Sequence, residues 1–184
     1  MAKITWKPGT MIYPVPAVMV SCGREGIGFN IITVSWTGTI CTNPPMTYIS
    51  LRRDRFSYDI IKDCGDFVIN LSTEALAFAT DFCGVRSGRE VDKFAHLGLM
   101  PGRSSKVNAP LILESPVNIE CIVKEIVPLG SHDMFISEVV AVNVDDQYID
   151  SNGKFSLERA KPICYNHGAY FSLGKNLGHF GFSV

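Results

Sequence analysis

The stretch MTYISLRRDRFSYDIIKDCGDFVINL, residues 46–71, gives the clearest indication of the fold. Its pattern predicts a strand, an arginine-rich turn, a short helix and a second strand, one directly after the other. In residues 46–51, Thr47, Ile49 and Leu51 fall on one side of an extended chain, and Tyr48 and Ser50 fall on the other. This alternation predicts a half-buried strand. Apolar side chains fall on one stripe of residues 57–64, where Ser57 is placed as an N-cap, so this segment predicts a helix. Residues 66–71 return to β-forming side chains. The stretch therefore predicts two strands joined through a short helix.

Strands also dominate the rest of the chain. Four further segments are apolar runs, rich in β-branched residues or alternating in polarity, namely 15–22, 29–36, 117–123 and 135–144. One more helix is indicated at residues 73–82, which begin with a cap-type threonine and carry an apolar stripe. Many antiparallel strands with a few short helices predict a mainly β fold, a barrel or a sandwich with peripheral helices.

Length and composition limit the classes of protein to which this chain can belong. Its 184 residues, 46% of them hydrophobic, are enough to bury a core, and no composition break divides them, so residues 1–184 are expected to form one domain. A formal net charge of -1 gives no field that would steer the chain to nucleic acid or to an anionic membrane. Residues 1–10 lack a signal-peptide pattern, and no apolar run approaches the roughly 18 residues of a membrane span, which predicts a cytoplasmic protein.

The six cysteines are widely spaced and form no CxxC pair. Structural zinc and iron–sulfur sites usually need close pairs, so no metal site is expected. A disulfide framework is disfavoured in the cytoplasm, and most of the thiols are interpreted as small buried apolar groups.

Three arginines and two serines surround the predicted helix start, in the segment SLRRDRFS at residues 50–57. Helix N-termini present free N–H groups and a partial positive charge, and guanidinium groups add bidentate donors that match phosphate. The segment is therefore a candidate phosphate site. The spacing leaves a second interpretation open, in which the arginines form a solvated surface turn with Asp54 as an ion-pair partner.

Two further segments are candidates for ligand contact. The stretch NIITVSWTGT, residues 30–39, runs from a strand into a loop that would offer N–H and hydroxyl groups to a flat heteroaromatic ring. An ordinary hairpin with Trp36 in the core is the alternative. The loop CGVRSGREVDKF, residues 83–94, is basic and glycine-containing, but it lacks the GxxxxGK[ST] spacing, which excludes a Walker-type site.

His132 lies in a turn at residues 130–133, ahead of a predicted strand. A histidine beside a pocket can orient a nicotinamide or move a proton, and the alternative is a turn histidine that binds a backbone carbonyl. The spacing supports no Ser/His/Asp arrangement and no carboxylate pair. A GxGxxG fingerprint is absent, which argues against a Rossmann NAD domain.

Four segments, in this order, resemble one family, the flavin reductase-like domain with the FMN-binding split-barrel fold, and within it the flavoredoxin subgroup. They are NIITVSWTGTICTNPPM (30–46), SLRRDRFS with DCGDFVINLS (50–57 and 63–72), CGVRSGREVDKF (83–94) and GSHDMFISEV (130–139). The resemblance spans about residues 10–145. It implies a Greek-key split β-barrel with a few peripheral helices, which forms a homodimer with one FMN at each subunit interface.

The resemblance also implies which residues contact the cofactor. Those that line the isoalloxazine ring are Asn30, Val34, Ser35, Trp36 and Thr37. Those that hold the ribityl chain and the phosphate are Ser50, Leu51, Arg52, Arg55 and Ser57. Those of the loop that closes over the flavin are Ser87, Gly88, Lys93 and Phe94. His132 matches the histidine of the family's Gly-Asp-His turn, which lies near the nicotinamide in two-component reductases, and Ser131 stands where the family has aspartate.

The function implied is that of an FMN-dependent oxidoreductase, which passes a hydride from NADH or NADPH to bound flavin and on to a further acceptor. The alternative is a flavoredoxin-like carrier that accepts electrons from a redox protein partner. A third interpretation is a barrel without flavin, which holds haem or serves as a structural dimer. The arginine cluster argues against this third interpretation, because haem needs an axial ligand and no phosphate site.

Overall fold

The computed structural model describes residues 1–184, and strands make up most of its regular structure. The strands are β1 (Val15–Pro16), β2 (Val18–Arg24), β3 (Gly28–Val34), β4 (Thr37–Thr42), β5 (Pro45–Leu51), β6 (Asp66–Leu71), β7 (Pro101–Gly102), β8 (Leu111–Ile112), β9 (Val117–Pro128), β10 (Asp133–Val144), β11 (Ile163–Asn166) and β12 (Ala169–Ser172). The helices are α1 (Phe56–Cys64), α2 (Ala77–Val85) and α3 (Lys93–Leu97), with short 3-10 turns at Glu74–Leu76, Asp146–Tyr148 and Leu157–Ala160. None of the helices has the length and apolarity that a membrane span requires.

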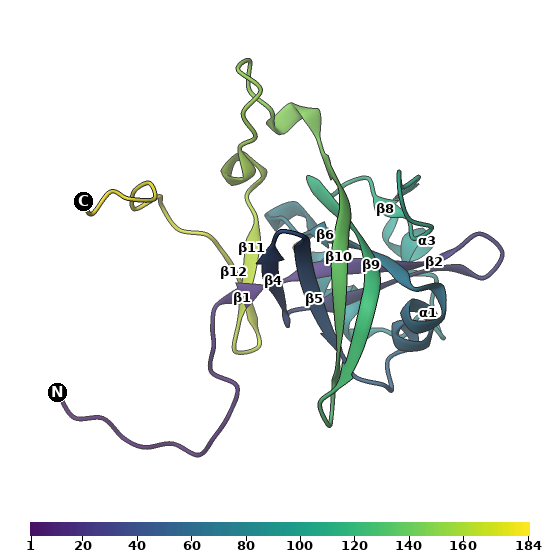
Figure 1. The fold of residues 1–184 in the computed structure, drawn as a ribbon, viewed down its shortest axis with the longest axis horizontal. Coiled ribbons are helices and arrows are strands. Elements are labelled where there is room, and N and C mark those ends of the chain that lie inside the picture. The colour runs from purple at the N-terminus through teal and green to yellow at the C-terminus, as the bar shows by residue number, and fades with distance from the viewer.

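Seven antiparallel strands form the main sheet, in the order β3–β2–β6–β9–β10–β5–β4. The long hairpin of β9 and β10 crosses the front of the molecule, next to β5 (Figure 1). The two end strands, β3 and β4, follow each other in the chain, and the sheet curls until β3 lies against β5. The result is a barrel that stays open between β3 and β4, which confirms the mainly β, split-barrel fold class.

A second sheet lies outside the barrel, in the order β1–β11–β12. Figure 1 shows this sheet beside β4, and both terminal segments leave the body on this side of the molecule. The pairing of β1 with β11 brings the beginning and the end of the chain together, with Val15 opposite Tyr165.

The six strands expected from the sequence are all present, with some ends shifted. The predicted alternation in β5 is confirmed, because Thr47, Ile49 and Leu51 are buried. The β9–β10 hairpin is longer than expected, since β9 continues to Pro128 and β10 starts at Asp133. The additional length carries the connecting turn beyond the end of β5.

Two helix starts differ from the prediction. Ser57 is not the N-cap of α1, because Arg55 occupies that position with extended backbone. Ser57 lies inside the first turn, where its hydroxyl accepts a hydrogen bond from Asn30. The helix expected at residues 73–82 is a 3-10 turn followed by α2, which continues to Val85.

Two apolar clusters lie on opposite faces of β2 and β3. One fills the barrel and includes the fully buried Phe67 and Phe135, and the other lies under α2 and α3 and includes Met19 and Ile31. Because both faces of β2 are covered, apolar side chains occur on both of them, and the one polar side chain in its buried part, Ser21, is hydrogen-bonded to the carbonyl of Pro110. The second cluster fixes α2 and α3 against β3, and thereby holds the loop between these helices near the start of α1.

Candidate functional site

Two adjoining hollows lie where β3 and β5 meet the start of α1, and Ile32 and Arg55 line both. Each has a volume of about 220 Å³. The first, the aromatic pocket, is lined by Tyr13, Ile32, Thr33, Val34, Ser35, Trp36, Ser50, Leu51, Arg52, Arg55, His132 and Tyr165. The second, the cationic pocket, is lined by Asn30, Ile32, Asp54, Arg55, Phe56, Ser57, Cys83, Arg86, Ser87, Gly88, Arg89 and Lys93.

The cationic pocket carries a strong local excess of positive charge. Arg55, Arg86, Arg89 and Lys93 line it together with a single carboxylate, that of Asp54. The chain as a whole has a net charge of -1, so this concentration of cations is local. Guanidinium and ammonium groups around one hollow suit an anion with several oxygens, such as a phosphate monoester.

The start of α1 forms one wall of the cationic pocket. The first N–H groups of a helix have no intrahelical acceptor and favour an anion. Asn30 Nδ2 donates to Ser57 Oγ at 2.7 Å, which fixes both side chains between β3 and α1. A Cβ added at Gly88 would stand 2.2 Å from Asn30 Oδ1 and 2.7 Å from the Phe56 ring. Glycine at this position therefore lets the loop between α2 and α3 approach α1 closely.

Lys93 is almost completely buried beside the same pocket, with 4% of its surface exposed. Its Nζ donates to the carbonyl oxygens of Ile31 at 2.6 Å and Cys83 at 2.8 Å. An ammonium has three N–H donors, so one is left for an anion in the pocket. Burial lowers the pKa of Lys93, because the ammonium loses its hydration. An anion bound nearby would favour the charged form again.

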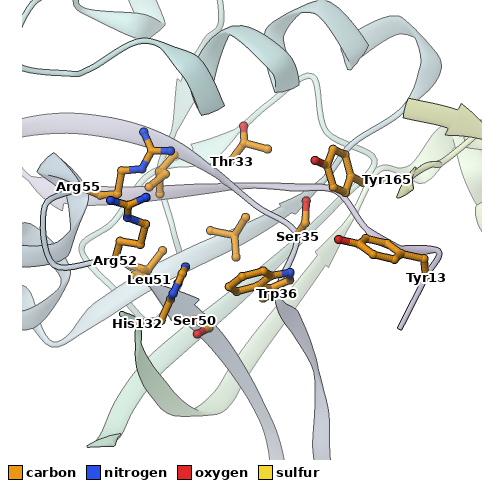
Figure 2. A pocket seen from close by; sticks show the side chains of 12 residues that line it. Tyr13, Thr33, Ser35, Trp36, Ser50, Leu51, Arg52, Arg55, His132 and Tyr165 are labelled. Carbon is orange, nitrogen blue, oxygen red and sulfur yellow. The ribbon is translucent and has the colours of Figure 1, made fainter. Parts of the chain in front are cut away.

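The aromatic pocket combines flat apolar surfaces with polar groups. In Figure 2, Trp36, Tyr13 and Tyr165 lie at one end of this pocket, and Arg52 and Arg55 lie at the other. Tyr13 precedes β1 and Tyr165 belongs to β11, and their ring centroids lie 6.2 Å apart. Such a lining suits a planar heteroaromatic ring with polar edges.

His132 borders the aromatic pocket from the turn before β10. Its ring centroid lies 4.5 Å from that of Trp36, and its Nδ1 lies 2.9 Å from Ser131 Oγ. Burial lowers the pKa of His132, and the positive charges of Arg52 and Arg55 lower it further. The imidazole is therefore neutral at neutral pH.

The three arginines of the turn before α1 have separate environments. Arg55 borders both pockets, whereas Arg52 borders the aromatic pocket and pairs with Asp54 at 3.0 Å on the surface. Arg53 borders neither pocket and binds the buried carboxylate of Asp133. Two of the three arginines thus line a pocket, and one of these two also forms the ion pair with Asp54 that the second interpretation expects.

The two pockets bring together all of the predicted site residues except Thr37 and Phe94. Thr37 begins β4, where its hydroxyl donates to the carbonyl of Tyr48. Phe94 is buried in the core under α2 and α3 and contacts Phe29 edge-on. Trp36 is 37% exposed, so the alternative that places it in the core is wrong.

The pocket residues that the sequence prediction did not include are Tyr13, Ile32, Thr33, Asp54, Phe56, Cys83, Arg86, Arg89 and Tyr165. Arg86 and Arg89 lie in the basic loop 83–94, whose composition is a usable signal for an anion site. Tyr13 and Tyr165 carry no such signal, because only the pairing of β1 with β11 brings them together.

Comparison with known proteins identifies the family. A family model described as the flavin reductase like domain matches residues 10–174. The structure of flavoredoxin from Desulfovibrio vulgaris (Miyazaki F) is 30% identical and has a TM-score of 0.91, covering 100% of this chain and 99% of its own. Flavoredoxin from Methanosarcina acetivorans is 25% identical with a TM-score of 0.91, covering 100% of this chain and 97% of its own. An uncharacterized protein of Archaeoglobus fulgidus is 30% identical over 166 residues, 90% of this chain and 88% of its own length. The chain therefore belongs to the flavin reductase-like domain family.

Proposed function

We propose that this protein is an FMN-dependent oxidoreductase, which passes a hydride from NADH or NADPH to bound flavin and on to a further acceptor. The observation that carries the proposal is the continuity of the two pockets, which share Ile32 and Arg55. Flavin mononucleotide has two matching parts, a phosphate monoester and a planar ring, joined by a polar chain. Membership of the flavin reductase-like family supports the same assignment.

In this proposal the cationic pocket holds the phosphate. Arg55, Arg86 and Arg89 supply guanidinium donors, Lys93 supplies one N–H, and the first turn of α1 supplies backbone N–H groups. Charge-assisted hydrogen bonds of this kind contribute about 1.5–3 kcal/mol each. Several of them together are enough to retain a mononucleotide.

The aromatic pocket would hold the isoalloxazine ring, with Trp36 and Tyr165 against its faces or edges and Ser35 and Ser50 near its polar atoms. When bound, FMN supplies the hydride chemistry, and the protein binds, orients and shields it. His132 presents a neutral imidazole beside the ring site, where it would orient the nicotinamide of the second substrate. Hydride transfer requires no acid or base from the protein, so we assign His132 an orienting role.

Rapid mixing of the FMN-loaded protein with NADH and, separately, with NADPH tests the hydride step. The expected result is loss of the visible absorption band of oxidised flavin, and the faster nucleotide identifies the co-substrate. If neither nucleotide bleaches the band, the protein is not a nicotinamide-dependent reductase.

A second candidate is a flavoredoxin-like electron carrier with a redox protein as its partner. Similarity to two flavoredoxins along the whole chain favours this candidate. A carrier is expected to keep FMN through gel filtration and to be reduced by reduced ferredoxin and not by nicotinamide. Loss of the flavin on the column would count against it.

We further propose that a second copy of this chain is a partner. Both terminal segments leave the body on the side of β1, β11 and β12 (Figure 1). These segments carry exposed apolar side chains, namely Ile4, Trp6, Met11, Ile12, Leu173, Leu177, Phe180 and Phe182. A two-fold dimer would cover them on both copies. Light scattering is expected to give twice the chain mass of 20.3 kDa, and the mass of a single chain would contradict the proposal.

We also propose that the protein works in the cytoplasm. All six cysteines are free, and free thiols persist in a reducing compartment. Burial raises the pKa of Cys22 and of Cys121 to about 12, which keeps both as unreactive thiols. Cell fractionation is expected to recover the protein with cytoplasmic marker enzymes, and recovery in an exported fraction would contradict this location.

A further inference from the structure

One side-chain cluster connects the turn 52–55 with the turn 129–132. Asp133, the first residue of β10, is 3% exposed. Its carboxylate accepts two hydrogen bonds from Arg53, Nε to Oδ2 and Nη2 to Oδ1, both at 2.8 Å. The hydroxyl of Tyr58 in α1 donates to Oδ2 at 2.5 Å. The cluster therefore ties both turns to α1 and to the main sheet.

No backbone hydrogen bond connects these two turns. The ladder between β5 and β10 ends at the pair of Leu51 and Asp133, so both turns continue beyond the sheet. The backbone hydrogen bonds of each turn stay within that turn or run to α1. Asp133 directly follows the turn 129–132, so its contact with Arg53 is a side-chain link between the turn 52–55 and the base of the other turn.

Each turn contributes polar groups to the aromatic pocket. Arg52 and Arg55 line this pocket from one turn, and His132 lines it from the other. Arg53 lines neither pocket, so its side chain has no direct access to a ligand there. A bidentate arginine–carboxylate pair has a fixed planar geometry, which restricts the relative movement of the segments that carry the two side chains.

The pair is charged at neutral pH. Hydrogen bonds from Arg53 and Tyr58 hold the pKa of Asp133 below its usual range. The same carboxylate raises the pKa of Tyr58, whose hydroxyl therefore stays protonated and keeps donating. The link is thus intact at neutral pH.

We propose that Arg53 and Asp133 are positioning residues, which set the separation between the two pocket arginines and His132. The inference rests on the proposed function for the identity of the bound groups, whereas the separation itself can be measured without flavin. When the link is broken, the turn 52–55 loses its side-chain tether to β10, whereas the ladder pair of Asp133 with Pro128 still holds the turn 129–132 in place. Arg52 and Arg55 are then free to move away from the imidazole of His132, which borders the same pocket.

Two variants test this proposal without a change of net charge at neutral pH. Arg53→Lys keeps the positive charge but cannot form the bidentate fork. Tyr58→Phe removes one hydroxyl and keeps the ring that packs against Phe135, at a centroid distance of 5.2 Å. Glu138→Gln is the control, because it breaks another ion pair of β10, the one with Lys124 at 2.6 Å, on the surface between β9 and β10.

The first readout is the pKa of His132 in flavin-free protein, followed by NMR, with the signal assigned through a His132→Gln variant. In the unsubstituted protein this pKa is lowered by burial, then by Arg52 and Arg55, against the opposing charge of Asp54. In Arg53→Lys and Tyr58→Phe it is expected to rise toward its ordinary value, because Arg52 and Arg55 are then free to move away from the imidazole. In the control it stays unchanged.

The second readout is the dissociation constant of FMN, which is expected to increase about three- to tenfold in both variants and not in the control. If the pKa of His132 is the same in both variants as in the unsubstituted protein, the positioning role is overturned, even where the melting temperature falls. Failure of the unsubstituted protein to bind FMN would refute the proposed function and would leave the NMR result valid on its own.

Discussion

Trp36 and His132 lie against each other at the edge of the aromatic pocket, with ring centroids 4.5 Å apart and an angle of 48° between their planes. Trp36 belongs to the connection between β3 and β4, and His132 to the turn before β10. Two segments from distant parts of the chain thus build one wall of the pocket. A ligand ring in the pocket would contact this wall, so substitutions of either side chain report on the same surface.

Trp36→Ala is expected to change the visible absorption spectrum of bound FMN, because the indole would no longer border the isoalloxazine ring. The control is Phe78→Ala in α2, where the ring is 75% exposed and borders neither pocket. Difference spectra of the loaded proteins make the comparison. Identical spectra for Trp36→Ala and the unsubstituted protein would place this indole away from the flavin.

His132→Ala is expected to slow the reduction of bound FMN by NADH or NADPH and to leave the FMN affinity nearly unchanged. The reason is that His132 lines the aromatic pocket and lies outside the cationic pocket. Stopped-flow absorbance gives the rate, with His179→Ala in the exposed C-terminal segment as the control. Equal reduction rates would remove His132 from its orienting role.

Arg55→Ala is expected to weaken FMN binding about tenfold or more, because it removes a charge-assisted hydrogen bond at the junction of both pockets. Arg52→Ala is expected to have a smaller effect, since Arg52 lines only the aromatic pocket and has Asp54 as a partner. Titration of FMN fluorescence measures both constants. Unchanged affinity in Arg55→Ala would contradict the assignment of the cationic pocket to phosphate.

Gly88→Ala is expected to reduce the FMN affinity. The new Cβ would lie 2.2 Å from Asn30 Oδ1, so either the loop or the hydrogen bond between Asn30 and Ser57 must give way. Gly174→Ala is the control, because no atom lies within 4 Å of the added Cβ at that glycine. Equal affinities of the two variants would show that the loop does not close on the cofactor.

Asp133 is expected to contribute to the loss of stability in acid. Its pKa is lower in the folded protein than in the unfolded chain, so its contribution is complete above the unfolded value and is lost as the pH falls through the folded value. Asp133→Asn should therefore lower the free energy of unfolding at neutral pH and flatten its decline below about pH 4. Urea unfolding at a series of pH values measures how steeply the free energy of unfolding falls with pH. The same steepness in Asp133→Asn and in the unsubstituted protein would contradict the lowered pKa of Asp133 in the folded state.

Individual strands could be predicted from the sequence, because the alternation or apolar run that marks a strand lies within a few consecutive residues. The alternation of Thr47, Ile49 and Leu51 predicts β5 correctly, and the apolar run of β2 follows from burial on both faces. The strand β4, by contrast, has the sequence TGTICT and lies at the edge of the sheet with much of its surface exposed, so it has no apolar pattern to detect.

Site residues that are brought together from distant parts of the chain could not be predicted in this way. The arginines of the segment 50–57 were recognised as a candidate anion site from their residue types, whereas Gly88 of the loop 83–94 was assigned through the family resemblance. The contribution of Tyr13 and Tyr165 depends on the pairing of β1 with β11, for which the sequence has no local signal. The partner of Arg53 was missed for the same reason, since Asp133 lies far along the chain.

The central claim is that the joined pockets hold one flavin mononucleotide in each chain. The most direct measurement is to incubate the purified protein with excess FMN, remove free ligand by gel filtration, and quantify the flavin released on denaturation. We expect one FMN for each chain, and a large loss of bound flavin in Arg55→Ala. A folded protein that retains no flavin after saturation would contradict the claim.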